Sequence, residues 1–305
     1  MFGRRPDGRR VKAMDPVVQM TPYLMPQRVD AQVYLSKKLD YETLARYIAQ
    51  KSAEGVKVTF MQLLIAAYVR GVSQVPEVNR FVMNKQVFNR TEITCAFTML
   101  RDTQDGSIEE TAVKIKFDPT DTIYDVARRV SAEIDANRPM ESANAVLKLA
   151  RAVLNIPGLP TVFVGLVKLL DRYGLLPKML LDILPFHTGL FVTNMASIGM
   201  TNVYHHIYNF GNTSLFMSLG SLERELVMEK DGSVRRRRLL PIGITADERV
   251  CAGATYAKLF AVMMDCFKHP EILENPPEKV YFNDGCEFHE PKPQKKAADN
   301  AAVSA

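Results

Sequence analysis

Apolar residues recur at helical spacing in four parts of the chain, and these parts predict four helices. The predicted helices are Tyr41–Glu54, Phe60–Val72, a segment from Thr120 or Asp121 to just before Pro139, and Ala254–Phe267. Asp40 and Thr59 directly precede the first two, and both are residue types that cap helices. The helix after Thr59 is apolar nearly all round, so we expect it to be buried.

Shorter stretches rich in β-branched and aromatic residues predict strands between these helices. The strands are Val33–Leu39, Glu92–Leu100, Ile108–Phe117, Leu190–Asn194, Ser214–Leu219, Leu222–Lys230 and Val234–Thr245, with a hairpin over Arg80–Arg90 that turns at Asn84-Lys85. Asp231-Gly232 is a strong hairpin signal between the last two strands. Because hairpins are mixed with helices, the order predicts an α+β sandwich, a mainly antiparallel or mixed sheet with helices on one side.

Two terminal segments differ in composition from the predicted domain, residues 15–289. Residues 1–14 are polar and basic, which predicts a flexible arm or a strand that docks on a neighbour. Residues 290–305 are rich in Lys, Ala and Pro and are typical of a disordered tail.

An apolar helical insertion is predicted over residues 145–185. Its longest uncharged run, Ala152 to Val167, has 16 residues and contains two prolines, whereas a spanning helix needs about 20 apolar residues. We therefore expect no membrane crossing. Packing on the domain or across a subunit contact is the interpretation we favour. The alternative is a membrane-surface helix with a cationic edge. That edge would consist of Lys148, Arg151, Lys168, Arg172 and Lys178.

Charge and cysteine spacing exclude several classes of protein. The net charge is +5, but the excess sits in two local runs without interleaved aromatics, so we predict no nucleic-acid partner. The four cysteines are far apart and form no CxxC pair, which argues against a zinc site and against a disulfide framework. The N-terminus lacks the apolar core of a secretory signal. We expect reduced thiols in a cytoplasmic protein that holds no metal.

One stretch, Thr245–Gly253, resembles a catalytic signature. The His-x-x-x-Asp-Gly motif of the chloramphenicol acetyltransferase and dihydrolipoyl acyltransferase superfamily usually reads Asp-His-Arg-Val-x-Asp-Gly. Asp247, Arg249, Val250 and Gly253 fit that pattern, whereas Glu248 stands at the histidine and Ala252 at the aspartate. The chain therefore resembles an acyltransferase scaffold whose central base has been replaced.

Two further segments support the resemblance to the catalytic domain of dihydrolipoyl acyltransferases, which covers roughly residues 15–275. Gly55–Asn79 is similar to the family's VKLT…LIKA…VPEVN segment, and Phe191–Gly199 to its FTISNLG…G strand and turn. The resemblance implies a chloramphenicol acetyltransferase-like two-layer sandwich, a homotrimer or a multiple of it, and an active site at the subunit interface. It also implies acyl-CoA as substrate. We expect a free-standing unit without lipoyl or subunit-binding domains.

The resemblance assigns candidate site residues. The family's oxyanion hydroxyl falls on Thr193, where it would donate to the oxygen of the tetrahedral intermediate. The proton-accepting histidine falls on Glu248. A thiol and a glutamate differ by about 4 pKa units, roughly 6 kcal/mol. Burial can raise a carboxylate by up to ~3–5 units, so Glu248 needs a dry pocket to act as base.

His205 and His206 offer a different base. They lie in the turn that leads to a family segment near the catalytic channel, and an imidazole already titrates near the operating pH. The alternative is that both are loop histidines bonded to backbone carbonyls. As a metal site the pair is weak, because no Cys or carboxylate stands at ligand spacing.

These features predict an acyl-CoA-dependent acyltransferase-like protein with a degenerate motif, either impaired or using a substitute base. The alternative, from a different class, is a non-catalytic trimeric scaffold or regulator associated with a membrane surface through residues 145–185. The residue at position 248 separates the two.

Overall fold

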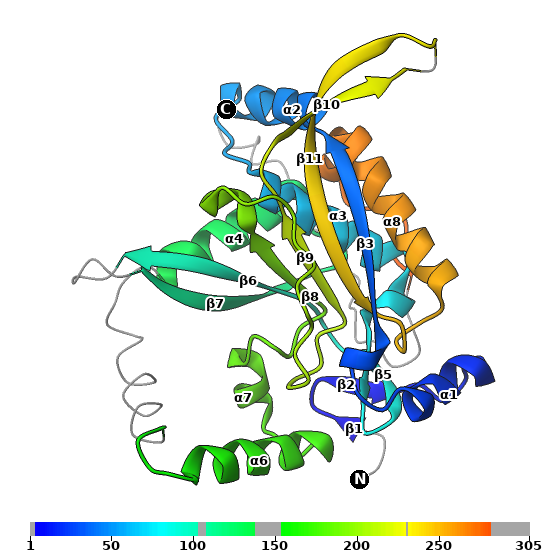
Figure 1. The fold of residues 1–305 in the computed structure, drawn as a ribbon, viewed down its shortest axis with the longest axis vertical. Helices are drawn as coiled ribbons and strands as arrows, with labels where there is room; N and C mark the ends of the chain where they lie inside the picture. The colour runs from blue at the N-terminus through cyan, green and yellow to red at the C-terminus, as the bar shows by residue number, and fades with distance from the viewer. Residues whose placement is uncertain (1–3, 103–107, 138–153, 230, 282–305) are drawn as a thin grey trace, which may run out of the picture.

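The computed structural model describes residues 4–102, 108–137, 154–229 and 231–281 (Figure 1). The helices are α1 (Pro16–Leu24), α2 (Tyr41–Ala53), α3 (Phe60–Gln74), α4 (Ile123–Asn137), α6 (Leu159–Arg172), α7 (Lys178–Ile183) and α8 (Gly253–Lys268). The strands are β1 (Arg4–Arg5), β2 (Gly8–Arg10), β3 (Gln32–Asp40), β4 (Arg80–Met83), β5 (Gln86–Arg90), β6 (Ile93–Asp102), β7 (Ile108–Phe117), β8 (Leu190–Asn194), β9 (Leu215–Leu219), β10 (Glu223–Met228) and β11 (Val234–Asp247). The predicted helices and strands are all present, with ends shifted by a few residues.

A mixed sheet forms the centre of the molecule (Figure 1). The described residues give it seven strands in the order β10-β11-β9-β8-β6-β7, with β3 paired to β11 as well. β8 runs parallel to both β6 and β9, whereas the other pairs are antiparallel. The predicted α+β sandwich with a mixed sheet is therefore confirmed.

The helices α2, α3, α4 and α8 cover one face of this sheet and make the main core with it. Local signals in the sequence start two of them. Asp40 accepts a hydrogen bond from the Thr43 amide at 3.1 Å at the start of α2. Thr59 and Gln62 form a reciprocal capping box at the start of α3. Each cap satisfies helix-end amides that would otherwise lack partners, which fixes where the helix begins.

The opposite face of the sheet carries a smaller apolar cluster. Because side chains alternate along a strand, Phe191 and Phe216 point to this face while their neighbours point to the main core. Residues 199–214, which form neither helix nor strand, cross this face and bury Ile207 against the two phenylalanines. A loop therefore covers this face, which we call the open face, whereas four helices cover the other.

The basic N-terminal segment differs from the predicted arm. β1 and β2 form a hairpin that joins β5 and β4 of the same chain in a four-stranded sheet. Arg5 is 4% exposed and forms ion pairs with Asp7 and Asp171. The long-range ion pair with Asp171 compensates the buried charge of Arg5 and holds the hairpin on its own chain. The predicted tail, 290–305, lies outside the described residues.

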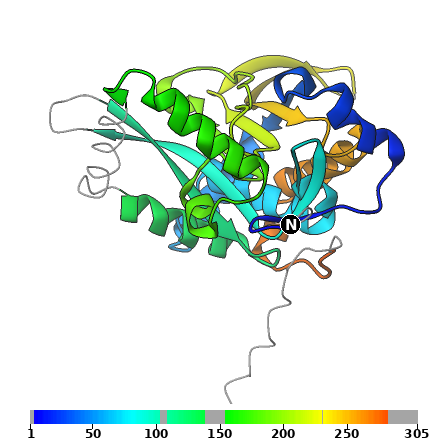
Figure 2. The same cartoon turned by 90° about the horizontal axis from the view of Figure 1, so that it is seen from below.

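The described part of the 145–185 insertion consists of α6 and α7 at one end of the molecule (Figures 1 and 2). Asp171, near the end of α6, is buried through its bonds to Arg5 and His187. Among the described helices, none is long and apolar enough to cross a membrane. The insertion is thus fastened to the domain at the C-terminal end of α6 and along α7, where Leu181 is buried and Asp182 pairs with Lys116.

Candidate active site

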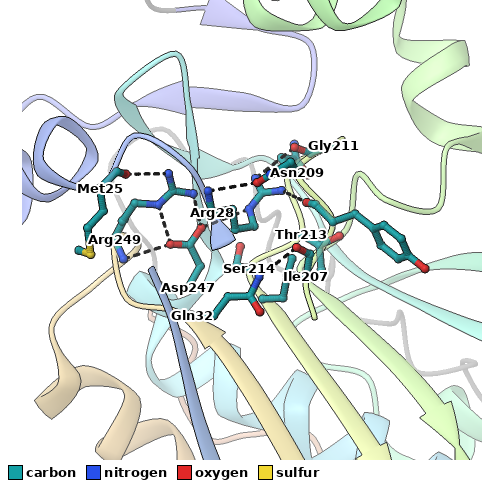
Figure 3. A network of polar contacts seen from close by, with 12 residues as sticks. Met25, Arg28, Gln32, Ile207, Asn209, Gly211, Thr213, Ser214, Asp247 and Arg249 are labelled. Carbon is teal, nitrogen blue, oxygen red and sulfur yellow. Dashed lines mark hydrogen bonds and ion pairs between the residues drawn. The ribbon is translucent and has the colours of Figure 1, made fainter. Parts of the chain in front are cut away.

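The turn that carries the degenerate motif is organised by buried charges (Figure 3). Asp247 is 1% exposed, and its carboxylate accepts hydrogen bonds from Arg249 Nε and Nη2 at 2.8 and 2.7 Å. Arg28, also buried, donates to the same carboxylate from Nε at 3.3 Å. Burial lowers the pKa of Arg28, and the Asp247 carboxylate opposes that shift. The two charged residues that the sequence retains from the motif, Asp247 and Arg249, therefore hold the turn in place.

The same network reaches the segment that carries the two histidines. Arg28 donates from its guanidinium to the carbonyls of Tyr208 and Gly211, the latter at 3.1 Å. Gln32 donates from Nε2 to the Ile207 carbonyl at 3.1 Å (Figure 3). Asp247 thus fixes, through Arg28, the C-terminal half of the loop that crosses the open sheet face.

The N-terminal half of this loop is held by a close approach to the sheet. The Val203 amide donates to Ser218 Oγ on β9 at 3.1 Å. A Cβ built on Gly243 would lie 2.3 Å from the Val203 carbonyl oxygen, so only glycine permits this contact. His205 follows two residues later, and its ring stacks on Phe216 at 4.6 Å with an 11° interplanar angle.

His205 and Thr193 line one cavity of about 500 Å³ on the open face. Its polar lining residues are Thr98, Glu110, Thr193, Asn194, Ser197, His205 and Tyr208. Thr193 Oγ1 lies 3.3 Å from Thr98 Oγ1. His205 Nδ1 and Asn194 Oδ1 are buried and find no hydrogen-bond partner among the described residues. A buried polar atom without a partner costs free energy, so each of these two atoms would favour a hydrogen bond that the described residues of one chain do not supply.

The protonation state of His205 suits a proton acceptor. Burial is the largest influence and lowers the pKa of His205; the charge of His206 adds to that effect, and Glu110 opposes it. The imidazole is therefore neutral at pH 7 and has a lone pair available. A neutral imidazole and a threonine hydroxyl in one cavity are the groups that acyl transfer requires, a base and an oxyanion donor.

His206 and Glu248 lie elsewhere. His206 is exposed, and its ring packs edge-on against Tyr208 at 4.9 Å. Glu248 is exposed and lines a second cavity of about 720 Å³ that α1, β3 and α8 enclose with mainly apolar side chains. The dry pocket that Glu248 needs to act as base is not formed by the described residues of one chain.

Glu248 and Thr193 are far apart within one chain. Thr193 pairs with Ser218, which pairs with Gly243, and Glu248 stands five residues beyond Gly243, directly after the end of β11. Two strand spacings and five residue rises place the two residues about 20 Å apart. One chain therefore brings Thr193 and His205 to the same cavity but keeps Glu248 away from it.

A set of metal ligands or a reactive thiol would be another kind of functional site. The described residues contain no cluster of three His, Cys, Asp or Glu side chains. Cys251 lines the second cavity, but burial raises the pKa of its thiol to about 12. Such a thiol stays protonated at pH 7 and is a poor nucleophile.

Sequence reasoning missed three residues of this site. Asn194 is next to Thr193 in the strand that resembles the family, but its unpartnered oxygen depends on tertiary packing. Glu110 lies on a predicted strand, and only the pairing of β6 with β8 brings that strand to the cavity. Arg28 binds a carboxylate 219 residues away, so no local pattern indicates its role.

Comparisons with known proteins show the fold. The structure is similar to a probable dihydrolipoamide acetyltransferase from Listeria monocytogenes 4b F2365, with a TM-score of 0.53, 14% identity, and coverage of 89% of this chain and 98% of that chain. It is similar to the cubic core of the pyruvate dehydrogenase multienzyme complex, with a TM-score of 0.51, 15% identity, and coverage of 86% and 93%.

A third similar structure is the dihydrolipoamide acetyltransferase of Azotobacter vinelandii, in whose catalytic mechanism the roles of a serine, a histidine and an asparagine have been investigated. It has a TM-score of 0.50, 14% identity, and coverage of 86% of this chain and 93% of that chain. No protein-family model matches the sequence, and no curated protein matches it. The chain has the fold of the dihydrolipoamide acetyltransferase cores, which confirms the predicted chloramphenicol acetyltransferase-like architecture.

Proposed function

We propose that the protein is an acyl-CoA-dependent acyltransferase in which His205 takes the place of the motif histidine as general base. The observation that carries this proposal is the neutral imidazole of His205, unpartnered at Nδ1, in the cavity that Thr193 lines. The similar structures support the reaction class through their fold.

The proposed reaction needs one proton acceptor and one oxyanion donor. His205 takes the proton of an acceptor thiol or hydroxyl, whose sulfur or oxygen attacks the thioester carbonyl carbon of acyl-CoA. The Thr193 hydroxyl donates to the oxygen that becomes negative, which contributes about 10²–10³-fold in rate. The carbon–sulfur bond then breaks, and protonated His205 returns its proton to the CoA thiolate. General-base catalysis of this kind contributes about 10²–10⁴-fold.

We further propose a homotrimer. The open sheet face presents exposed aromatic side chains beside the cavity. Tyr34 and Tyr204 are 53% and 50% exposed and form an edge-on pair at 5.8 Å. A second copy would cover them and dry the cavity. The buried, unpaired Cys95, Cys251 and Cys266 agree with the cytoplasmic location that we predict.

An acetyl-transfer assay tests the proposal. Acetyl-CoA and a small thiol or alcohol acceptor are given to the native protein and to His205→Gln, His206→Gln and Glu248→Gln. We expect a loss of about 10²–10⁴-fold in kcat/KM for His205→Gln. His206→Gln is the matched control, because it makes the same change one residue along, outside the cavity, and should keep the native rate.

Three outcomes contradict the proposal. A loss in Glu248→Gln with His205→Gln unaffected would assign the base to the motif position. Equal rates in all variants would remove His205 from catalysis. Absence of transfer in a protein that binds CoA, also after Glu248→His with Ala252→Asp rebuilds the family motif, would favour the non-catalytic scaffold.

A further inference from the structure

The helix α6 is amphipathic, and its C-terminal end is fastened to the domain by polar contacts. Lys168, Asp171 and Arg172 lie three and four residues apart and therefore share one side of the helix. Asp171 is 2% exposed, with its carboxylate 2.6 Å from Arg5 Nη2 and 2.8 Å from His187 Nε2. Arg172 donates from Nε to Asn84 Oδ1 at 2.9 Å. Asp171 is thus the buried anchor of this side, while Lys168 and Arg172 at its edges remain exposed.

The apolar side of α6 faces away from the domain. Val162, Leu166 and Leu169 follow one another at helical spacing and are 69%, 53% and 51% exposed. On α7, Met179 and Ile183 are likewise 79% and 69% exposed. The outward side of α6 therefore does not pack on its own domain, and the contact across subunits that we expected as the other possibility stays a prediction. Exposed apolar side chains gathered in this way mark an interaction site.

The charges around this surface identify the kind of partner. Residues 154–185 contain two carboxylates, and both are paired within the chain: Asp171 as above, and Asp182 with Lys116 at 3.1 Å and Lys178 at 3.2 Å. Lys168 and Arg172 are exposed beside the apolar side. The surface therefore offers apolar side chains and cations without a free carboxylate, which is the pattern that anionic lipid surfaces attract.

We propose that α6 and α7 dock this protein on the surface of an anionic lipid bilayer. The apolar side of α6 enters the boundary between headgroups and acyl chains, while Lys168 and Arg172 meet the lipid phosphates. The end of the molecule that Figure 2 views directly is then the membrane-facing end. This proposal is independent of the acyltransferase reaction, because it rests on residues outside the Thr193–His205 cavity.

Vesicle flotation with the full chain tests this docking. We expect the native protein to float with vesicles of mixed phosphatidylcholine and phosphatidylglycerol and to float much less with phosphatidylcholine alone. Val162→Glu with Leu166→Glu should lower partitioning of the protein onto the vesicles about a hundredfold. In the native protein both apolar side chains leave water when α6 enters the bilayer surface, and the variant loses that gain. Lys168→Glu with Arg172→Glu should lower partitioning by more than about thirtyfold, because each basic residue contributes roughly fivefold near an anionic surface and the new carboxylates are repelled.

Matched controls come from the β10–β11 hairpin at the other end of the molecule (Figure 1). Leu226→Glu with Met228→Glu changes two side chains that are both 75% exposed, and Arg235→Glu with Arg236→Glu reverses two exposed charges. Both control variants should float like the native protein. All four variants change exposed positions, and circular dichroism verifies that each is folded.

Three results would overturn the proposal. The native protein staying in the soluble fraction with anionic vesicles is the first. The second is equal loss of flotation in the hairpin controls, which would indicate nonspecific charge. The third result combines two observations. Light scattering shows that the native protein is an oligomer and that Val162→Glu with Leu166→Glu dissociates it, while vesicles bind neither the native protein nor this variant. That result would assign the surface to a second copy of the chain.

Discussion

The two cavities that contain candidate site residues differ in what lines them. The cavity beside the motif turn is lined mainly by apolar side chains, and its carboxylate, Glu248, is exposed. The cavity on the open sheet face joins Thr193 with the unpartnered polar atoms of Asn194 and His205. The motif that carries the family resemblance and the polar groups suited to acyl transfer therefore lie at different places in one chain.

The motif turn itself has an exposed part and a buried part. Its outward-facing positions, Glu248 and Ala252, are the two that differ from the signature that the turn resembles. Its inward-facing positions, Asp247 and Arg249, form a buried ion-pair network that reaches the His205 loop through Arg28. If His205 is the base that we propose, the motif supports a base supplied by another segment.

Asp247→Asn should have the largest effect. Removing one partner of a buried ion pair leaves charge unpaired, here the guanidinium groups of Arg28 and Arg249, and typically costs about 3–5 kcal/mol. Urea unfolding should show this loss of unfolding free energy. Glu248→Gln, one residue away but exposed, is the control and should change it by less than about 0.5 kcal/mol. If both substitutions lowered the unfolding free energy by similar amounts, buried Asp247 would not be a stronger structural support than exposed Glu248.

Several parts of this architecture follow from local sequence signals. Asp40 and Thr59 start helices because a side-chain oxygen accepts a hydrogen bond from a free amide in the first turn. The cap and the amide lie within four residues of each other, so the local sequence predicts where the helix begins. Asn84-Lys85 turns its hairpin with both residues at positive φ, as the strand pattern on either side predicts. The family-like segments coincide with elements of the fold, since Gly55–Asn79 contains α3 and Phe191–Gly199 contains most of β8.

Long-range contacts explain what the sequence could not predict. The docking of the N-terminal hairpin depends on Arg5 meeting Asp171, 166 residues away. His205 and His206 are equivalent in a loop without periodicity, and only the contact of the loop with Ser218 and Gly243 turns His205 onto Phe216. The sequence thus offered two histidines, and packing distinguishes between them.

Gly243→Ala tests the close approach that positions the His205 loop. The new Cβ would lie 2.3 Å from the Val203 carbonyl oxygen, which is backbone and cannot rotate away. We expect a destabilisation of about 1–3 kcal/mol, as for other overpacked sites, together with a fall in acetyl transfer at unchanged α-helix content. Gly232→Ala, in the exposed β10–β11 turn, is the control. Its φ of +81° strains alanine, so this variant should lose stability without displacing the His205 loop. If Gly243→Ala kept native activity, the account of loop positioning would be wrong.

Ala252→Asp should have the smallest effect, with the opposite sign. Ala252 is the N-cap residue of α8, and its side chain makes no capping bond. An aspartate there can accept a hydrogen bond from a first-turn amide, so the unfolding free energy should rise by about 1 kcal/mol. Ala252→Asn should give a similar gain, because asparagine caps as well. A loss of stability in both variants would show that the position needs an apolar residue.

The pH dependence of acetyl transfer tests the central claim most directly. Because burial lowers the pKa of His205, its imidazole is the free base at neutral pH and becomes protonated only as pH falls through that lowered value. The account predicts a kcat/KM that is constant through neutral pH and declines below about pH 6.5, the ordinary histidine value. That decline should disappear in His205→Gln and persist in Glu248→Gln. A decline that persists in His205→Gln and disappears in Glu248→Gln would contradict the account.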